Sequence, residues 1–156
     1  MDTKILTQFL LDSNQAGYAA GDEKKWVKEK NGSTTIQFSK GDLRSHDNFF
    51  GGEPYGGRLV VFQNEKPVWI MVYYGQVVET AVADDVYKIL RSALQRMPKD
   101  APFRGPKEFV DGDFKYINSW SGDVEKYNGT EKIMKNGKLI YKASYIGGLV
   151  DKRGGV

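Results

Sequence analysis

Apolar and polar residues alternate along several stretches of the chain, which is the pattern of antiparallel strands that bury one face. In residues 42–50, Leu43 and Phe49 fall on one face, and polar side chains occupy the other. A hairpin is predicted next, over residues 58–74. A second hairpin is predicted around Asn136-Gly137, a dipeptide that favours a tight type I′ turn.

Two other segments repeat apolar residues at helical spacing. The first predicts a helix over residues 3–17. The second predicts a helix over 84–97, where Asp84 and Asp85 complement the positive end of the helix dipole and Pro98 prevents its continuation. Each predicted helix precedes a set of predicted strands.

The two halves also match each other in sequence, at an offset of 71 residues that becomes 72 after a one-residue insertion. Phe38-x-x-Gly41-Asp42-Leu43 aligns with Phe109-x-x-Gly112-Asp113-Phe114. Farther along, Tyr73-x-Gly75 aligns with Tyr145-x-Gly147. Glycines, aromatic residues and aliphatic residues keep one order, which indicates an internal duplication.

We therefore predict a single α+β domain, residues 1–156, built from two repeats at about 3–79 and 84–151. Each repeat is a helix plus an antiparallel β-meander, with a cystatin-like element order. The whole domain would then have about two helices and seven to eight strands.

Alternation also assigns the faces of the hairpin strand. One face is apolar in both repeats and is expected to be core. Its members are Trp69, Met71 and Tyr73 in the first repeat and Tyr141, Ala143 and Tyr145 in the second. The opposite face is apolar only in the first repeat, where it holds Val68, Ile70, Val72 and Tyr74. We expect that face to be covered, preferably by packing of the two halves against each other, with the 18–37 connection or a second subunit as alternatives.

Composition removes several classes of site. The chain has no cysteine and one histidine, so disulfides, thiolate or multi-histidine metal sites and cysteine nucleophiles are excluded. We expect no metal and no cofactor. The net charge of +3 comes from intermixed basic and acidic residues, which gives no basis for specific nucleic-acid binding. Without a signal peptide or a membrane-spanning apolar run, the expectation is a cytoplasmic monomer or homodimer with no membrane partner.

One polar set is suited to acid–base chemistry. Asp42, Arg44 and His46 share a face of the predicted strand, and Asp47 is adjacent. Histidine is the side chain whose ordinary pKa lies near neutrality. An enzyme would therefore use His46 with Asp42 and Asp47 as acid–base groups. The favoured interpretation is a solvated strand face whose charges pair across strands.

A second hypothesis is a ligand cavity between helix and sheet. Aromatic residues on strands are usually core, but tyrosine hydroxyls can also orient a small ligand. Pro102-Phe103-Arg104-Gly105-Pro106 is a stiff connection whose arginine can pair with a buried carboxylate or bind an anion. The candidate ligand-binding residues are Trp69, Tyr73, Tyr141, Tyr145, Arg44 and Arg104.

Four segments together resemble a prokaryotic domain family of unknown function. They are Gly51-Gly52, the hairpin from Lys66-Pro67-Val68-Trp69 to Tyr73-Tyr74-Gly75, the proline-bracketed segment 102–106, and Tyr145-x-Gly147-Gly148. The resemblance covers about residues 5–151. Domains of that family occur alone or behind a helix-turn-helix of the XRE type. It implies a regulator's companion domain that senses a ligand or dimerises, and it implies no catalytic residues.

Taken together, these features predict a non-catalytic module that senses a small molecule or binds a protein partner, linked to transcriptional regulation. The alternative is a small enzyme centred on His46. The two hypotheses differ in whether His46 lines the deepest pocket, because an enzyme needs its acid–base groups to converge there.

Overall fold

The computed structural model describes residues 1–78 and 83–153 of the chain. Within these residues it has two α-helices, two short 3-10 helices and nine strands. The helices are α1 (Thr3–Ala16), η1 (Tyr18–Ala20), η2 (Glu23–Lys25) and α2 (Ala83–Leu94). The strands are β1 (Val27–Lys28), β2 (Thr34–Lys40), β3 (Leu43–Phe50), β4 (Tyr55–Gln63), β5 (Lys66–Val77), β6 (Glu108–Asp111), β7 (Phe114–Asp123), β8 (Lys126–Lys135) and β9 (Lys138–Leu149). The α+β class is confirmed; the predicted end of the first repeat, residue 79, lies outside the described residues.

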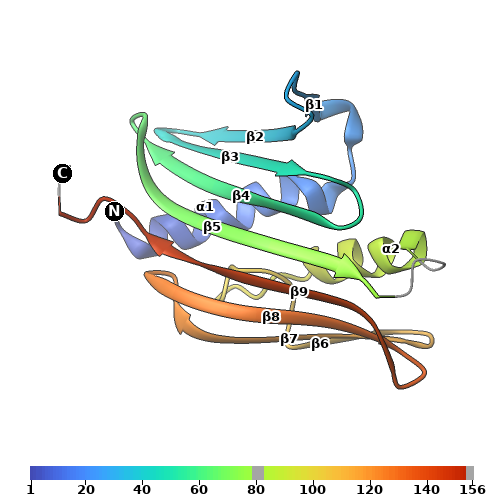
Figure 1. Cartoon of the computed structure of the whole chain (residues 1–156). Coiled ribbons are helices and arrows are strands. Elements are labelled where there is room, and N and C mark those ends of the chain that lie inside the picture. The colour runs from blue at the N-terminus through green and yellow to red at the C-terminus, as the bar shows by residue number, and fades with distance from the viewer. Residues whose placement is uncertain (79–82, 154–156) are drawn as a thin grey trace.

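All the described strands form one antiparallel sheet in the order β1-β2-β3-β4-β5-β9-β8-β7-β6 (Figure 1). Strands β5 and β9 are the central pair, with Tyr73 directly opposite Tyr145. The described sheet has more strands than the seven to eight that were predicted. The difference arises in the 18–37 connection, which contains β1 and the start of β2.

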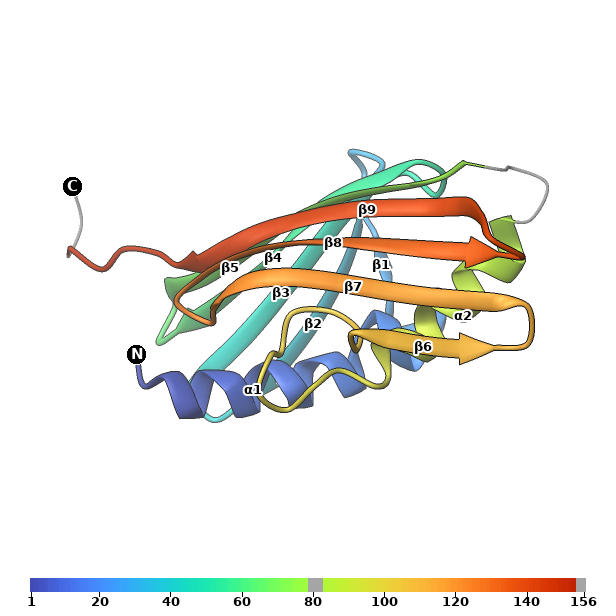
Figure 2. The same cartoon turned by 90° about the horizontal axis from the view of Figure 1, so that it is seen from below.

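Both α-helices lie on the same face of the sheet, called the inner face below (Figures 1 and 2). Helix α1 agrees with the predicted 3–17, and the carboxylate of Asp2 caps its first turn. Helix α2 ends at Leu94, short of the predicted 97, because the amides of Arg96 and Met97 bond three residues back and tighten the last turn. Neither helix in the described part of the chain is long and apolar enough to cross a membrane.

The inner face carries the core, as the alternation predicted. Trp69, Met71 and Tyr73 of β5 and Tyr141, Ala143 and Tyr145 of β9 are all buried. Helix α1 packs Leu6, Phe9 and Leu10 against one part of this face. Helix α2 packs Val86, Ile89 and Leu90 against another part. The amphipathic stripes of the helices therefore bury themselves on the apolar face of the strands.

The outer face of β5 is only partly covered in the described residues, where Val68 and Ile70 are half-buried, and the predicted packing of one half against the other is wrong. Val72 and Tyr74 are 46% and 56% exposed, and their neighbour Ile146 on β9 is 61% exposed. The reason is topological: the halves join edge to edge through β5 and β9. Their outer faces then lie side by side in one surface instead of facing each other.

The two halves of the sheet share backbone features at the predicted spacing. Toward the centre, the strand order is β2-β3-β4-β5 in one half, with β1 outside β2, and β6-β7-β8-β9 in the other. The last hairpin of each half turns at an asparagine with φ 48°, Asn64 or Asn136. These amides donate to the carbonyls of Asp42 and Asp113, at 3.0 and 3.2 Å. The register also shifts once in each half, at Val61/Phe62 and at Ile133/Met134.

Candidate functional site

A cavity of about 790 Å³ lies between the helices and the sheet. Among the described residues, the strand residues that line it come from β1 to β5, and none comes from β6 to β9. The floor consists of Ile36, Phe38, Asp47, Phe49, Tyr55, Leu59, Met71 and Tyr73. Helices α1 and α2 and the segment around Phe103 and Arg104 complete the walls. A volume of this size suits a drug-sized small molecule.

The cavity has a buried end and an open end. Leu10, Met71 and Phe103 line the interior, and each is at most 3% exposed. Exposed residues of η2, of the Gly51-Gly52 loop and of the start of α2 line the other end. This arrangement gives a ligand a route from solvent to the apolar interior.

The glycine-rich loop at the open end is held in place by Glu53. One carboxylate oxygen accepts the backbone amide of Val77 at 2.7 Å, and the other accepts the hydroxyl of Tyr87 on α2. The same hydroxyl lies 2.8 Å from the carbonyl oxygen of Gly52. Burial, followed by the Glu53 carboxylate, raises the pKa of Tyr87, so the phenol stays protonated as a donor.

Three aromatic rings line the cavity beside η1 and β1. Tyr18 stacks on Trp26 with centroids 5.5 Å apart, and both meet Phe49 edge-on at 6.3 and 6.2 Å. The guanidinium of Arg91 lies over Tyr18 and Trp26, and it is 3.4 Å from the carboxylate of Glu23. The 18–37 connection thus contributes a wall of the cavity.

Asp47 brings a carboxylate into this largely apolar space. It accepts a 2.5 Å hydrogen bond from the hydroxyl of Tyr73 on β5. Burial raises the pKa of Asp47 to about 6, although the Tyr73 hydrogen bond and the charge of Arg104 both act to lower it. Asp47 therefore changes charge close to physiological pH.

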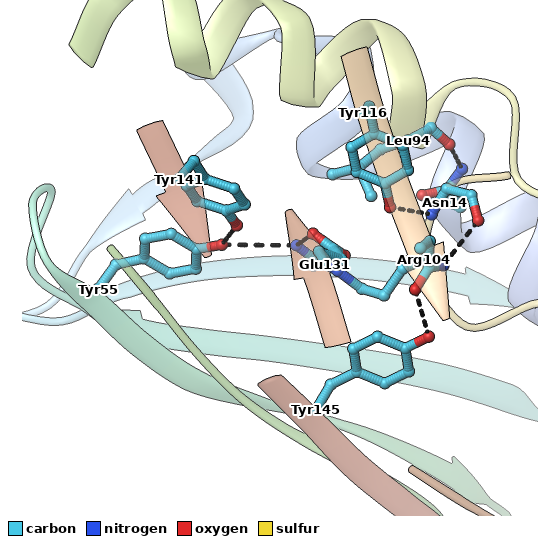
Figure 3. Close-up of polar contacts among 10 residues, drawn as sticks. Asn14, Tyr55, Leu94, Arg104, Tyr116, Glu131, Tyr141 and Tyr145 are labelled. Carbon is cyan, nitrogen blue, oxygen red and sulfur yellow. Dashed lines mark hydrogen bonds and ion pairs between the residues drawn. The ribbon is translucent and has the colours of Figure 1, made fainter. Parts of the chain in front are cut away.

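Arg104 forms a buried ion pair with Glu131 of β8, whose side chain is fully buried (Figure 3). The pair is bidentate, because Nε and Nη2 of Arg104 bond the two carboxylate oxygens. The hydroxyl of Tyr55 lies 3.5 Å from Nη2 and bonds the hydroxyl of Tyr141. Burial alone would lower the pKa of Arg104, but the charge of Glu131 raises it above its ordinary value. The sequence hypothesis that Arg104 pairs with a buried carboxylate is confirmed.

The structure brings two of the six predicted ligand residues, Tyr73 and Arg104, to the cavity. Trp69, Tyr141 and Tyr145 lie on the same inner face but are packed inside the core. Arg44 is on β3 outside the cavity, where its guanidinium pairs with Glu65 at 2.9 Å and covers the ring of Phe62.

The residues of the acid–base hypothesis are separated by the sheet. Asp47 faces the cavity, whereas His46 is not among the described lining residues and, as its chain neighbour, points to the outer face. Burial, then Arg58 and Arg44, lowers the pKa of His46. Asp42 lies in the turn before β3 and accepts from Gln63 at 2.8 Å. Among the described residues, no group of three or more histidine or acidic side chains is placed to hold a metal ion.

Several lining residues were not singled out from the sequence. Tyr18, Trp26 and Phe49 belong to three different segments, and Arg91 and Tyr55 come from α2 and β4. The alternation along β3 predicted that Phe49 lies on the buried face, whereas Asp47 was grouped with His46 and turns out to share the face of Phe49. No local pattern indicates that the 18–37 connection folds over that face.

Comparison with known proteins identifies a family for this chain. Searches among curated proteins and among solved structures find no match. A family model described as a domain of unknown function, DUF5680, matches residues 47–150, which is more than half of the chain. The match spans β4 to β9 and α2 and includes the cavity residues Asp47, Tyr73 and Arg104. The chain therefore belongs to the DUF5680 family of domains of unknown function.

Proposed function

We propose that this protein is a binding module that takes up a small molecule between its helices and the first half of its sheet. The observation that carries the proposal is the 790 Å³ cavity with a buried apolar end and an open end. Aromatic walls supply contact area, and a few polar groups give a ligand its orientation, as in most ligand sites.

Binding accounts for the polar groups better than catalysis does. The enzyme hypothesis requires His46, Asp42 and Asp47 to act on one substrate. Only Asp47 faces the cavity. Arg104, the other charged group deep in the wall, is held by Glu131 in a bidentate pair. We therefore propose a non-catalytic site, with Tyr73 and Arg104 as part of its wall.

The proposed regulatory role is supported by the sequence resemblance alone. Domains that the sequence resembles occur alone or behind helix-turn-helix segments, so ligand binding here would control a partner in transcription. The remaining parts of this proposal are a cytoplasmic location, no specific nucleic-acid contact and a monomeric or homodimeric state.

We also propose that the fold arose by duplication of a helix-plus-meander unit with cystatin-like order. The matched strand order, register shifts and asparagine turns support it. Tyr73 and Tyr145, which align in sequence, face each other across the central pair. That position is expected for residues near a pseudo-twofold axis.

Nile red, a neutral dye that fluoresces in apolar surroundings, tests the existence of the site. We expect saturable binding of one dye per chain, with a blue-shifted emission. The variant Leu59→Trp fills the cavity floor with a larger side chain and should abolish the signal. Val110→Trp, at a β6 position that is 61% exposed, adds the same ring away from the cavity and should leave binding unchanged.

Two results would contradict the binding proposal. The first is dye fluorescence that rises without saturation, as for adsorption to the outer face. The second is equal binding by wild type and Leu59→Trp, provided that both variants melt cooperatively. Equal loss in both tryptophan variants would show that the added ring, and not the filled cavity, is responsible.

A further inference from the structure

We propose that the ligand of this cavity is an organic cation, an amine with an apolar body, whose ammonium group pairs with the carboxylate of Asp47. This inference rests on the proposed function and names the chemical class that the site takes. The cavity wall contains charged side chains, and some of them are neutralised by a neighbouring group.

Asp47 is an interior charge that makes no ion pair within the described part of the chain. Its carboxylate has a hydrogen bond from Tyr73. Arg104 is neutralised by Glu131. Arg91 lies 3.4 Å from the exposed Glu23, and its buried Nε has no hydrogen-bond partner among the described residues. An ionised carboxylate in apolar surroundings is unfavourable unless a cation joins it. A bound ammonium would supply that cation.

The position that matches Asp47 in the second half of the sheet shows which partner is missing. Asn118 accepts the hydroxyl of Tyr145 at 2.8 Å, as Asp47 accepts that of Tyr73. The amide of Asn118 also donates to the carbonyl of Gly105 at 2.8 Å. A carboxylate has only acceptors, so Asp47 needs donors where Asn118 supplies its own. A ligand bound in the cavity can supply these hydrogen-bond donors to Asp47.

The walls around Asp47 suit a cation with an apolar body. Phe49, Tyr55 and Tyr73 line the same cavity as the carboxylate. The faces of aromatic rings attract ammonium groups, and more strongly when water is excluded. Close to Asp47, a free anion would meet the carboxylate and an arginine, Arg104, that Glu131 already neutralises, so this part of the wall favours the opposite sign. The unpaired Nε of Arg91 belongs to a guanidinium that lies over Tyr18 and Trp26.

The charges that face Asp47 from each side determine how binding depends on pH. Tyr73 on β5 donates to it, and Arg104 approaches from the segment after α2. Helix α1 contributes Leu10 and the neutral polar side chains of Ser13 and Asn14 to the cavity wall. Toward the open end, α2 contributes Arg91 and Lys88 together with Asp84 and Asp85, and other segments contribute Glu23, Lys28 and Glu53. With a pKa of about 6, Asp47 is expected to change charge between about pH 5 and 8, while an alkyl ammonium stays protonated.

Three probes with one aromatic body test the sign of the charge: naphthylethylamine, naphthylethanol and naphthylacetate. Titration calorimetry on the full chain at about pH 8 should give the amine an affinity at least about tenfold above the other two. Asp47→Asn should reduce the affinity for the amine to that for the alcohol, and it should leave the affinity for the alcohol unchanged. His46→Gln, one residue away on the outer face, should change none of the three.

Lowering the pH of the wild type provides a second measurement that needs no variant. Protonation of Asp47 should lower the affinity for the amine about tenfold at about pH 5, while the affinity for the alcohol stays the same. The cation proposal is overturned if naphthylacetate binds most tightly, or if the affinity for the amine changes neither with pH nor with Asp47→Asn. Either result leaves the cavity as a binding site. Failure of all three probes to bind, together with no saturable Nile red signal, would overturn the binding proposal as well.

Discussion

The two halves of the sheet have the same strand order but differ in what they hold on the inner face. The half formed by β2 to β5 borders a cavity, whereas the half formed by β6 to β9 is filled by its own side chains. Two matched positions differ in the side chain that they place on the inner face. Tyr116, fully buried, stands where the first half has Ser45, and Glu131, which pairs with Arg104, stands where it has Leu59.

Two halves with the same strand order can therefore differ in whether the inner face borders a cavity. Large side chains and an internal ion pair occupy the space in the second half. In the first half, α1 and the 18–37 connection close around a space that the side chains of the strands do not fill. The pairs Tyr73–Asp47 and Tyr145–Asn118 repeat one contact in both settings, so they allow direct tests.

The largest expected effect comes from breaking the ion pair of the filled half. Glu131→Gln leaves the buried charge of Arg104 without a counter-ion, which should lower the free energy of unfolding by about 3–5 kcal/mol. The exposed pair of Glu108 with Lys115 is the control, and Glu108→Gln should cost less than about 1 kcal/mol. Urea unfolding measures both. Equal costs would show that the second half is not held by its interior pair.

Asp47→Asn should stabilise the protein at neutral pH. The folded-state pKa of Asp47 is about 6, above the ordinary 3.8, so its ionisation opposes folding and stability falls as pH rises through this interval. We expect the variant to gain about 1–3 kcal/mol over wild type at about pH 8 and little at about pH 4. Unfolding at both pH values checks this. A variant destabilised at pH 8 would mean that Asp47 has a partner in the folded chain.

The two tyrosine contacts should differ in their contribution to stability. Tyr145→Phe leaves the buried oxygen of Asn118 without its donor and should cost about 1–3 kcal/mol. Tyr73→Phe removes the matching donor from Asp47, but water can enter the cavity and replace it, so we expect about 1 kcal/mol or less. Comparing the two melting temperatures sharpens the contrast between the halves. A larger loss of stability in Tyr73→Phe than in Tyr145→Phe would contradict the expected difference between the halves.

The smallest effect is expected on the outer face. Val72→Lys places a charge at a site that is 46% exposed, so the free energy of unfolding should change by about 0.5 kcal/mol or less. Light scattering should give the same mass for wild type and variant. A dimer that becomes a folded monomer in Val72→Lys would show that a second copy covers this face.

Local pattern by itself determined the elements and their faces. Period-two alternation placed β3 and β5 and separated Phe49 from His46, because successive side chains of a strand point to opposite sides. Helical spacing located α1 and α2 within a few residues. The offset of 71 to 72 residues anticipated the matched turns at Asn64 and Asn136. These features depend on interactions between residues that are close together in the sequence, so a local pattern is enough to predict them.

Only the tertiary structure decided what covers each face and where space remains. Alternation shows that Val72 and Tyr74 share a side but not that β5 and β9 join edge to edge and leave it exposed. The contact of Asp47 with Tyr73 and the pair of Arg104 with Glu131 join residues 26 and 27 positions apart. A cavity is the volume that side chains from several elements fail to fill, so it depends on packing among distant segments and has no local signature.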